Sequence, residues 1–186
     1  MAETDTAVRP HDDAPVTTSK TARPDRDLFA ETTTIRKPAQ ELYDFWRNLP
    51  NLAQFMDNID SIEKIDDRRS HWRVRAPMDK IVEWDAVITE DVPGKSLSWQ
   101  SEDGADVPNS GKVEFKDAGA RGTIVRAVIA YESPMGVVGK IVAKIFQREP
   151  RIQARRDLRR FKQLMETGEI ATASRTKAML AEEQKA

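Results

Sequence analysis

Alternation of apolar and polar residues over a long central stretch limits what this chain can fold into. Between Ile59 and Ser133 apolar side chains recur at every second position within each run, as in Trp72, Val74 and Ala76. A period of two is typical of strands with one buried and one solvated face. Turn signals separate the runs, at Pro93-Gly94, Asp103-Gly104 and Arg121-Gly122. The stretch therefore predicts an antiparallel meander of about six strands, whose apolar face another element must cover.

One strand and two short helices are predicted ahead of the meander. The β-branched run at 28–35 favours a strand. Pro38 then suits a first helical position, and apolar residues at spacings of three and four up to Leu49 indicate an amphipathic helix. Asn51 is a candidate cap for a second short helix.

The C-terminal region predicts two helices whose apolar faces point in different directions. Proline cannot donate the helical hydrogen bond and disfavours helix at the residue before it. We therefore expect a short helix at 136–147, a break at Glu149-Pro150 and a longer helix that begins at Pro150. The longer helix is the element that we expect to cover the meander.

The ends of the chain differ in composition from its middle. Residues 1–26 carry few large apolar side chains and are expected to be a disordered tail, followed by one domain at 27–168. Residues 169–186 are expected to be flexible or weakly helical. Neither a membrane-spanning apolar run nor a secretory signal pattern is present, so we expect a cytoplasmic protein.

Residue usage argues against the commonest kinds of catalytic centre. The 186 residues include no cysteine and two histidines, which excludes disulfides and thiolate chemistry and leaves little for an imidazole metal cluster. We expect no metal and no cofactor. The 30 basic and 31 acidic residues nearly cancel, but residues 144–162 hold eight Lys/Arg and two Asp/Glu, so 22 basic and 29 acidic residues remain elsewhere.

Six stretches of the sequence occur in an order that resembles a known superfamily. They are PAQELYDFW at 38–46, NLAQFM at 51–56, VEWDA at 82–86, LSW at 97–99, GTIV at 122–125 and DLRRFK at 157–162. In this order the chain resembles the SRPBCC or START-like superfamily, and most closely its polyketide cyclase/dehydrase and coenzyme-Q-binding branch. The resemblance implies an α+β helix-grip fold, with a curved antiparallel sheet of about six to seven strands wrapped round a long C-terminal helix. It also implies a hydrophobic ligand cavity between the sheet and that helix.

Strand alternation and helical spacing predict which side chains face such a cavity. Three of the four tryptophans lie on strand faces assigned inward, where they either fill the core or line a pocket. The predicted cavity residues are Tyr43, Trp46, Phe55, Trp72, Val74, Val82, Trp84, Ala86, Trp99, Ser101, Phe115, Val125, Ala127, Ile129, Tyr131, Leu158, Phe161 and Met165.

Acidic residues and the one histidine of the domain do not form a catalytic pattern. His71 alternates with apolar positions, and Glu83 and Asp85 share its face, so all three are expected on the solvated side. The pairs Asp66-Asp67 and Glu90-Asp91 are expected at strand ends, where turns favour acidic residues.

Cyclase-type chemistry would instead need polar groups on the cavity side. Tyr43, Ser101 and Tyr131 are the candidates for polarising a ligand carbonyl. Ser98 and Ser101 lack a histidine base, so no nucleophile–base pair is predicted.

Two features near the C-terminus suggest partners. The first is an apolar helix with Val138, Ile141, Val142 and Ile145, for which we hypothesise a gate over the cavity that can touch a membrane surface. The alternative is an ordinary buried helix whose lysines reach solvent. The second is a basic stripe on the longer helix, made of Arg148, Arg151, Arg155, Arg159 and Lys162. Such a stripe suits an anionic membrane, or a ribosomal or nucleic-acid surface, and a solvated helix face is the alternative reading.

The sequence thus favours a protein that binds a lipid, an isoprenoid quinone or a polyketide-like molecule as a carrier, chaperone or sequestering protein. An aromatase/cyclase-type enzyme is the first alternative. An interaction protein that uses the basic C-terminal helix is the second.

Overall fold

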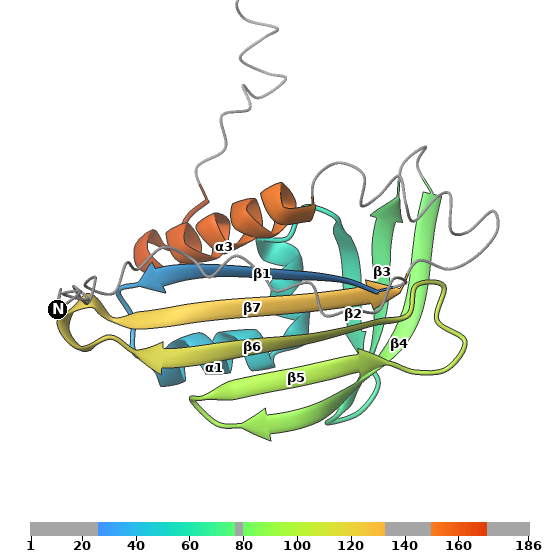
Figure 1. The fold of residues 1–186 in the computed structure, drawn as a ribbon, viewed down its shortest axis with the longest axis horizontal. Coiled ribbons are helices and arrows are strands. Elements are labelled where there is room, and N and C mark those ends of the chain that lie inside the picture. Colours follow the sequence, from blue (N-terminus) through green and yellow to red (C-terminus); the bar gives the residue numbers. More distant parts are fainter. Residues whose placement is uncertain (1–25, 77–79, 133–149, 171–186) are drawn as a thin grey trace, which may run out of the picture.

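Seven antiparallel strands form one sheet in the computed structural model, which describes residues 26–76, 80–132 and 150–170 (Figure 1). Across the sheet the strands follow the order β1-β7-β6-β5-β4-β3-β2, so the predicted meander from β2 to β7 is confirmed. The strands are β1 Arg26–Ile35, β2 Ile59–Lys64, β3 Arg69–Ala76, β4 Lys80–Val92, β5 Ser96–Ser101, β6 Asn109–Asp117 and β7 Thr123–Glu132. A short 3-10 turn, η2 Gly119–Arg121, lies between the last two.

Two helical segments follow β1, as expected, but the second begins earlier than predicted. Helix α1 spans Ala39–Arg47, and the 3-10 helix η1 spans Leu49–Gln54. The sequence predicts that Pro50 ends the first helix, but Pro50 is instead the second residue of η1, since proline fits the first turn of a helix. Asn51 therefore lies inside η1 and does not cap it; its side-chain amide donates to the Phe45 carbonyl at 3.0 Å.

The last described element, α3 Pro150–Thr167, begins at the residue where the sequence predicts it. The expected helix at 136–147, the gate residues Val138, Ile141, Val142 and Ile145, and Arg148 lie outside the described residues. So do most of the two expected tails.

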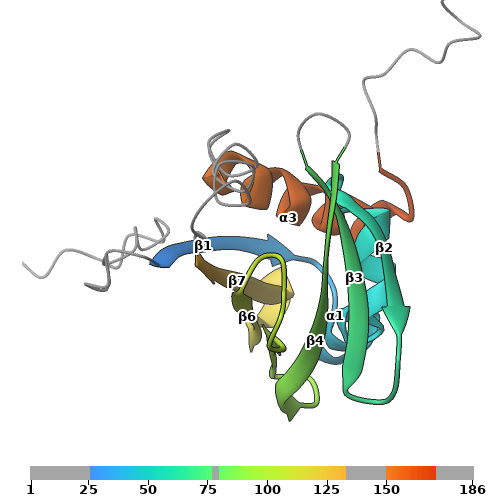
Figure 2. The same cartoon turned by 90° about the vertical axis from the view of Figure 1, so that its right-hand side faces the viewer.

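The sheet is curled, and the helices occupy its concave side. Figure 2 shows β1, β7 and β6 on one side and β4, β3 and β2 on the other, with α1 between them and α3 across the opening. This is the helix-grip arrangement expected from the sequence. The predicted inward alternation also holds: Trp72, Val74 and Val82 are buried, whereas Arg75 and Glu83 are exposed.

Helix α3 joins the two edges of the curled sheet. On the β1 side, Lys162 Nζ donates to the Thr34 carbonyl at 2.6 Å, and Glu166 Oε1 accepts the Arg36 N–H at 2.7 Å. On the other side, the Arg160 guanidinium forms an ion pair with Asp57, in the loop between η1 and β2. The helix is therefore fixed to both borders of the concave space.

Aromatic rings fill the region where α1, η1 and α3 meet. Phe161 of α3 lies 4.9 Å from Phe55 and 5.1 Å from Trp46, measured between ring centroids. All three side chains are almost fully buried. This end of the concave side is a packed core.

Candidate ligand site

The side chains predicted to face a cavity do lie on the concave side. Apart from Ser101, all of them belong to the hydrophobic core or pack against it; Trp84, Ile129 and Met165 are the partly buried members. Ser101 is half-buried, and its hydroxyl accepts the Asn109 N–H at 3.0 Å. Together with Tyr131, Ser101 lines a pocket of about 270 Å³ at the ends of β5, β6 and β7.

A row of three tryptophans covers the concave face of β3, β4 and β5. The Trp72 ring lies nearly parallel to Trp84, with centroids 6.0 Å apart, and to Trp99, with centroids 6.4 Å apart. Glycine at position 111 makes room for this row, because a Cβ there would lie 2.2 Å from Cζ2 of Trp99. The result is a broad aromatic surface on one wall of the concave space.

The indole nitrogens of this row differ in their hydrogen bonding. Trp72 Nε1 donates to Ser70 Oγ at 2.9 Å. Trp84 Nε1 is buried and has no hydrogen-bond partner, although Trp84 as a whole residue is only partly buried. Buried donors without partners are uncommon, so this N–H is a candidate for a ligand contact.

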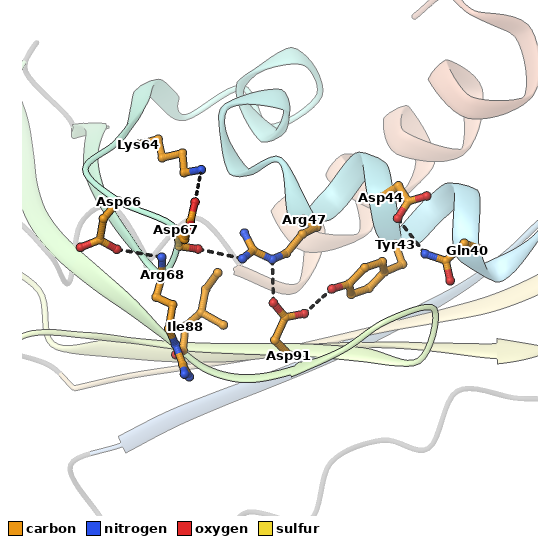
Figure 3. Close-up of polar contacts among 10 residues, drawn as sticks. All are labelled: Gln40, Tyr43, Asp44, Arg47, Lys64, Asp66, Asp67, Arg68, Ile88 and Asp91. Atoms are coloured by element: carbon orange, nitrogen blue, oxygen red, sulfur yellow. Dashed lines mark hydrogen bonds and ion pairs between the residues drawn. The ribbon is translucent and has the colours of Figure 1, made fainter.

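A polar network connects α1 to β4 (Figure 3). Asp91 accepts hydrogen bonds from the Tyr43 hydroxyl and from Arg47 Nε, the second at 2.7 Å. Burial, the hydrogen bond to Asp91 and its charge raise the pKa of Tyr43 to about 12. Burial also raises the pKa of Asp91, but the bonds from Tyr43 and Arg47 outweigh it and hold that pKa below its usual value. The Tyr43 hydroxyl, a predicted ligand group, is therefore occupied by an ionised carboxylate.

Sequence reasoning missed Asp91 because of an irregularity in β4. Glu90 and Asp91 lie near the end of β4, as expected, but within the strand, which continues to Val92. A register shift between Ile88 and Glu90 turns Asp91 toward α1. Glu90 instead bonds to Ser98 and Lys112 of neighbouring strands. If the alternation continued unbroken from Ile88, the charged Glu90 side chain would point toward the core. A charge at a core position is the one sequence signal for the register shift.

A charged pocket of about 270 Å³ lies beside this network, between α1 and the β2–β3 turn. Its charges are satisfied within the protein. Lys64 Nζ pairs with Asp67 at 2.7 Å, and Arg68 Nη2 donates to the Ile88 carbonyl at 2.8 Å. Arg47 Nη2 of α1 also donates to the Asp67 carbonyl at 2.7 Å, which holds the turn against the helix, so we assign this pocket a structural role.

The convex face carries the candidate acid–base residues, as predicted. His71 Nδ1 lies 2.7 Å from Asp85 Oδ1, and Glu83 Oε1 lies 3.1 Å from Arg73 Nε. Further ion pairs cross the strands of this face: Arg69–Glu102, Arg75–Asp60, Lys112–Glu90 and Arg126–Glu114. The acidic residues in these pairs therefore bond to basic residues of the sheet and not to α3.

The described part of the basic stripe has mixed surroundings. Arg155 Nε lies 3.6 Å from the buried Glu31 carboxylate, and Lys162 is used in the contact with β1. Arg159 is exposed and, among the described residues, has no carboxylate within 4.0 Å. The Arg151 side chain lies outside what the structure describes. Of the predicted stripe, Arg159 is thus the described residue left free for an anionic partner.

A second residue that sequence reasoning missed is Asp157 of α3. It is 7% exposed, and Gln153 Nε2 donates to its Oδ1 at 2.9 Å. Burial raises its pKa to about 7, against smaller lowering effects of Gln153 and Arg156. Its place one turn before Phe161, on the apolar half of the helix, is the sequence signal for its burial.

No group of three or more His, Cys, Asp or Glu residues within the described ranges has the arrangement of a metal site. None of the described helices is long and apolar enough to cross a bilayer.

Comparison with known families adds to this geometry. The family model described as polyketide cyclase/dehydrase and lipid transport matches residues 35–159. The chain belongs to this family. The match runs from the end of β1 into α3, so it includes the tryptophan row and Asp157.

Similar proteins are found among solved structures and curated sequences. The DR_A0006 protein of Deinococcus radiodurans is 41% identical, with a TM-score of 0.63, over 77% of this chain and 100% of that one. The Zhui aromatase/cyclase of a Streptomyces species is 12% identical, with a TM-score of 0.60, over 78% of this chain and 99% of that one, and it shares the fold. An uncharacterized 17.2 kDa protein of Streptomyces lincolnensis is 28% identical over 137 residues, which are 73% of this chain and 87% of that protein.

Proposed function

We propose that this member of the polyketide cyclase/dehydrase and lipid transport family binds a hydrophobic small molecule on the concave side, between the sheet and α3. The ligand classes are those of the sequence analysis: a lipid, an isoprenoid quinone or a polyketide-like compound. The protein would act as a carrier, chaperone or sequestering protein. The proposal rests chiefly on the tryptophan row, in which Trp84 is partly buried and has an unpaired N–H.

The two ends of the concave side support a location for the ligand. Near α1 the rings of Trp46, Phe55 and Phe161 pack against one another. At the β3–β5 wall Trp72 and Trp99 are buried, and Trp84 is partly buried. Apolar walls with few polar groups are typical of small-molecule sites.

Aromatase/cyclase activity is the second candidate function, because Zhui shares the fold. The candidate polar groups give it less support. The Tyr43 hydroxyl donates to Asp91, and the Ser101 hydroxyl accepts from the Asn109 backbone.

Native mass spectrometry of the protein purified from its own host tests the binding proposal. We expect an adduct that organic extraction releases as an apolar compound. Trp84→Ala should lower the occupied fraction at least tenfold, whereas the control Ile65→Ala, at the exposed β2–β3 turn, should not change it. Absence of any adduct, together with no saturable binding of the neutral dye N-phenyl-1-naphthylamine, would refute the proposal.

The same material distinguishes a carrier from an enzyme. The extracted compound is returned to ligand-free protein, incubated, and extracted again. A carrier returns the compound unchanged, whereas a cyclase returns a dehydrated or cyclised product with a different mass.

The free Arg159 supports a further, weaker proposal of a contact with an anionic membrane surface through α3. Flotation with anionic vesicles at low salt tests it, and Arg159→Glu is expected to reduce the floated fraction. Retention on RNA instead of vesicles would favour the nucleic-acid alternative.

A further inference from the structure

Helix α3 presents one acidic side chain to the interior of the fold. The flank of α3 that faces β1 carries Lys162, which contacts Thr34. The opposite flank carries Arg160, which pairs with Asp57. At about 100° per residue, Asp157 lies between Arg160 and the core residue Phe161 on this second flank. With 7% of its surface exposed, its carboxyl group points into the molecule.

The carboxyl group of Asp157 has few partners where it lies. Gln153 Nε2 is its one hydrogen-bond donor among the described residues, and it reaches Oδ1. No Lys, Arg or His nitrogen of the described residues lies within 4.0 Å of it. An ionised carboxylate can accept about four hydrogen bonds, so the charged form is poorly satisfied here. The neutral acid form instead offers an O–H donor at Oδ2.

A second unpaired donor faces the concave space from the sheet. Trp84 Nε1 is buried without a partner. The tryptophan row on the sheet and Asp157 on α3 thus each have a hydrogen-bond donor to offer on the concave side. Two hydrogen-bond donors of this kind suit a ligand whose polar atoms are hydrogen-bond acceptors.

We infer, on the basis of the proposed function, that Asp157 in its carboxylic acid form donates a hydrogen bond to a neutral carbonyl oxygen of an otherwise apolar ligand. Ketones, quinones and esters have such an oxygen. A fatty acid anion does not suit the site, because its buried negative charge would have no basic partner among the described residues next to Asp157. The burial that keeps Asp157 neutral up to a pH of about 7 supports this role.

Proton linkage follows from this contact. If the neutral acid binds the carbonyl and the carboxylate does not, affinity falls up to tenfold for each pH unit above the titration of Asp157. Binding above that pH also takes up a proton.

Two molecules with the same carbon skeleton test the inference: butyrophenone, which has a ketone oxygen, and butylbenzene, which lacks it. Their affinities are measured by displacement of N-phenyl-1-naphthylamine between pH 6 and pH 9. For the wild type we expect butyrophenone affinity to fall at least tenfold over this range and butylbenzene affinity to stay constant. Asp157→Asn keeps an N–H donor without a titrating proton, so its butyrophenone affinity should not depend on pH.

Asp157→Leu removes the donor and keeps a similar volume. It should weaken butyrophenone about tenfold at pH 6 and leave butylbenzene unchanged. Asp117→Asn, at the exposed end of β6, is the matched control and should behave as the wild type.

Calorimetry of the wild type in two buffers with different ionisation enthalpies gives a readout that needs no variant to fold. Near pH 7.5 we expect proton uptake with butyrophenone and none with butylbenzene. Equal pH profiles of the wild type and Asp157→Asn, or equal proton uptake for both molecules, would overturn the inference while leaving the binding proposal intact. If neither molecule displaces the dye from any variant, both the binding proposal and the inference fail.

Discussion

Two aspartates on the concave side show how surroundings set the protonation of one residue type. Asp91 receives hydrogen bonds from Tyr43 and Arg47, and its pKa lies below the usual value. Asp157 receives one bond from Gln153, and burial raises its pKa to about 7. The first is an ionised structural partner, whereas the second can exchange a proton near neutral pH.

Tyr43→Phe tests how much the hydrogen bond between Tyr43 and Asp91 contributes to stability. The substitution removes the O–H that bonds to Asp91 and keeps the ring against Phe115. Because hydrogen bonds to charged groups contribute more than neutral ones, we expect a loss of about 2 kcal/mol in the free energy of unfolding at pH 7. Urea denaturation measures it, and a double-mutant cycle with Asp91→Asn isolates the pair. A coupling energy near zero would show that water replaces the tyrosine.

Asp157→Asn tests the raised pKa of Asp157 through the pH dependence of the free energy of unfolding. The folded-state pKa of Asp157 is raised, so the folded protein binds more protons than the unfolded chain between about pH 4 and pH 7. The contribution of Asp157 to stability is therefore complete below this window and decreases as pH rises through it. At about 1.4 kcal/mol per pKa unit, the loss is at most about 4 kcal/mol.

The measurement is the difference in unfolding free energy between Asp157→Asn and the wild type, at pH 5 and at pH 8. We expect the variant to be relatively more stable at pH 8, since it has no charge to bury. The same difference at both pH values would contradict a raised pKa. Other titrating groups cancel in this comparison.

Sequence patterns predicted the residues whose position depends on local period. His71, Trp72 and Glu83 lie on the faces that the alternation gives them. Asp91 and Asp157 could not be placed in the same way, because the first depends on a bulge and the second on packing across the fold. Local sequence pattern thus predicted which face of a strand a residue occupies. Tertiary contacts determine which acidic residues are buried or bonded on the concave side.

Among the elements, β5 and β6 depend on each other through Trp99 and Gly111. Trp99 lies directly opposite Gly111 in the sheet register, and its ring occupies the place of a side chain there. The tryptophan row therefore needs glycine at this position. From the sequence alone, a glycine at position 111 would be expected to weaken the strand.

Gly111→Ala should displace the Trp99 ring and disturb its stacking on Trp72. Overpacking of this kind costs about 1–3 kcal/mol. Urea denaturation gives the loss, and near-ultraviolet circular dichroism reports the changed tryptophan surroundings. Ser110→Ala, one position along β6, is the control and should leave the spectrum unchanged; an unchanged spectrum for Gly111→Ala would contradict the predicted contact.

Element boundaries were predicted where proline or turn chemistry fixes them. Pro150 begins α3 as expected, and Gly94, Gly104 and Gly122 each have positive φ at or beside a turn. The start of η1 was misplaced because Pro50 is compatible with both the end of one helix and the first turn of the next. Such ambiguity is resolved by packing of Leu49 and Leu52 into the core.

In the whole molecule, Phe161 connects α3 to the rest of the core. Its ring contacts Phe45, Trp46 and Phe55. Phe161→Ala should lower the unfolding free energy by about 3–5 kcal/mol, as for other buried aromatic residues. Hydrogen exchange should show the largest loss of protection in α3. Ile152→Ala, where the side chain is 42% exposed, should change stability by less than about 0.5 kcal/mol. Equal effects of the two substitutions would mean that α3 is not held through Phe161.

The bonds between α3 and β1 also bear on solubility. An edge strand with free carbonyl and N–H groups can pair with a strand of another molecule and so begin aggregation. Lys162 and Glu166, one helical turn apart, occupy the Thr34 carbonyl of β1 and the N–H of Arg36, the residue after β1. The helix thereby takes the place that a neighbouring strand would have. Loss of α3 would consequently expose both the apolar interior and a β1 edge that can pair with another molecule. We expect this loss to lead to intermolecular β-sheet.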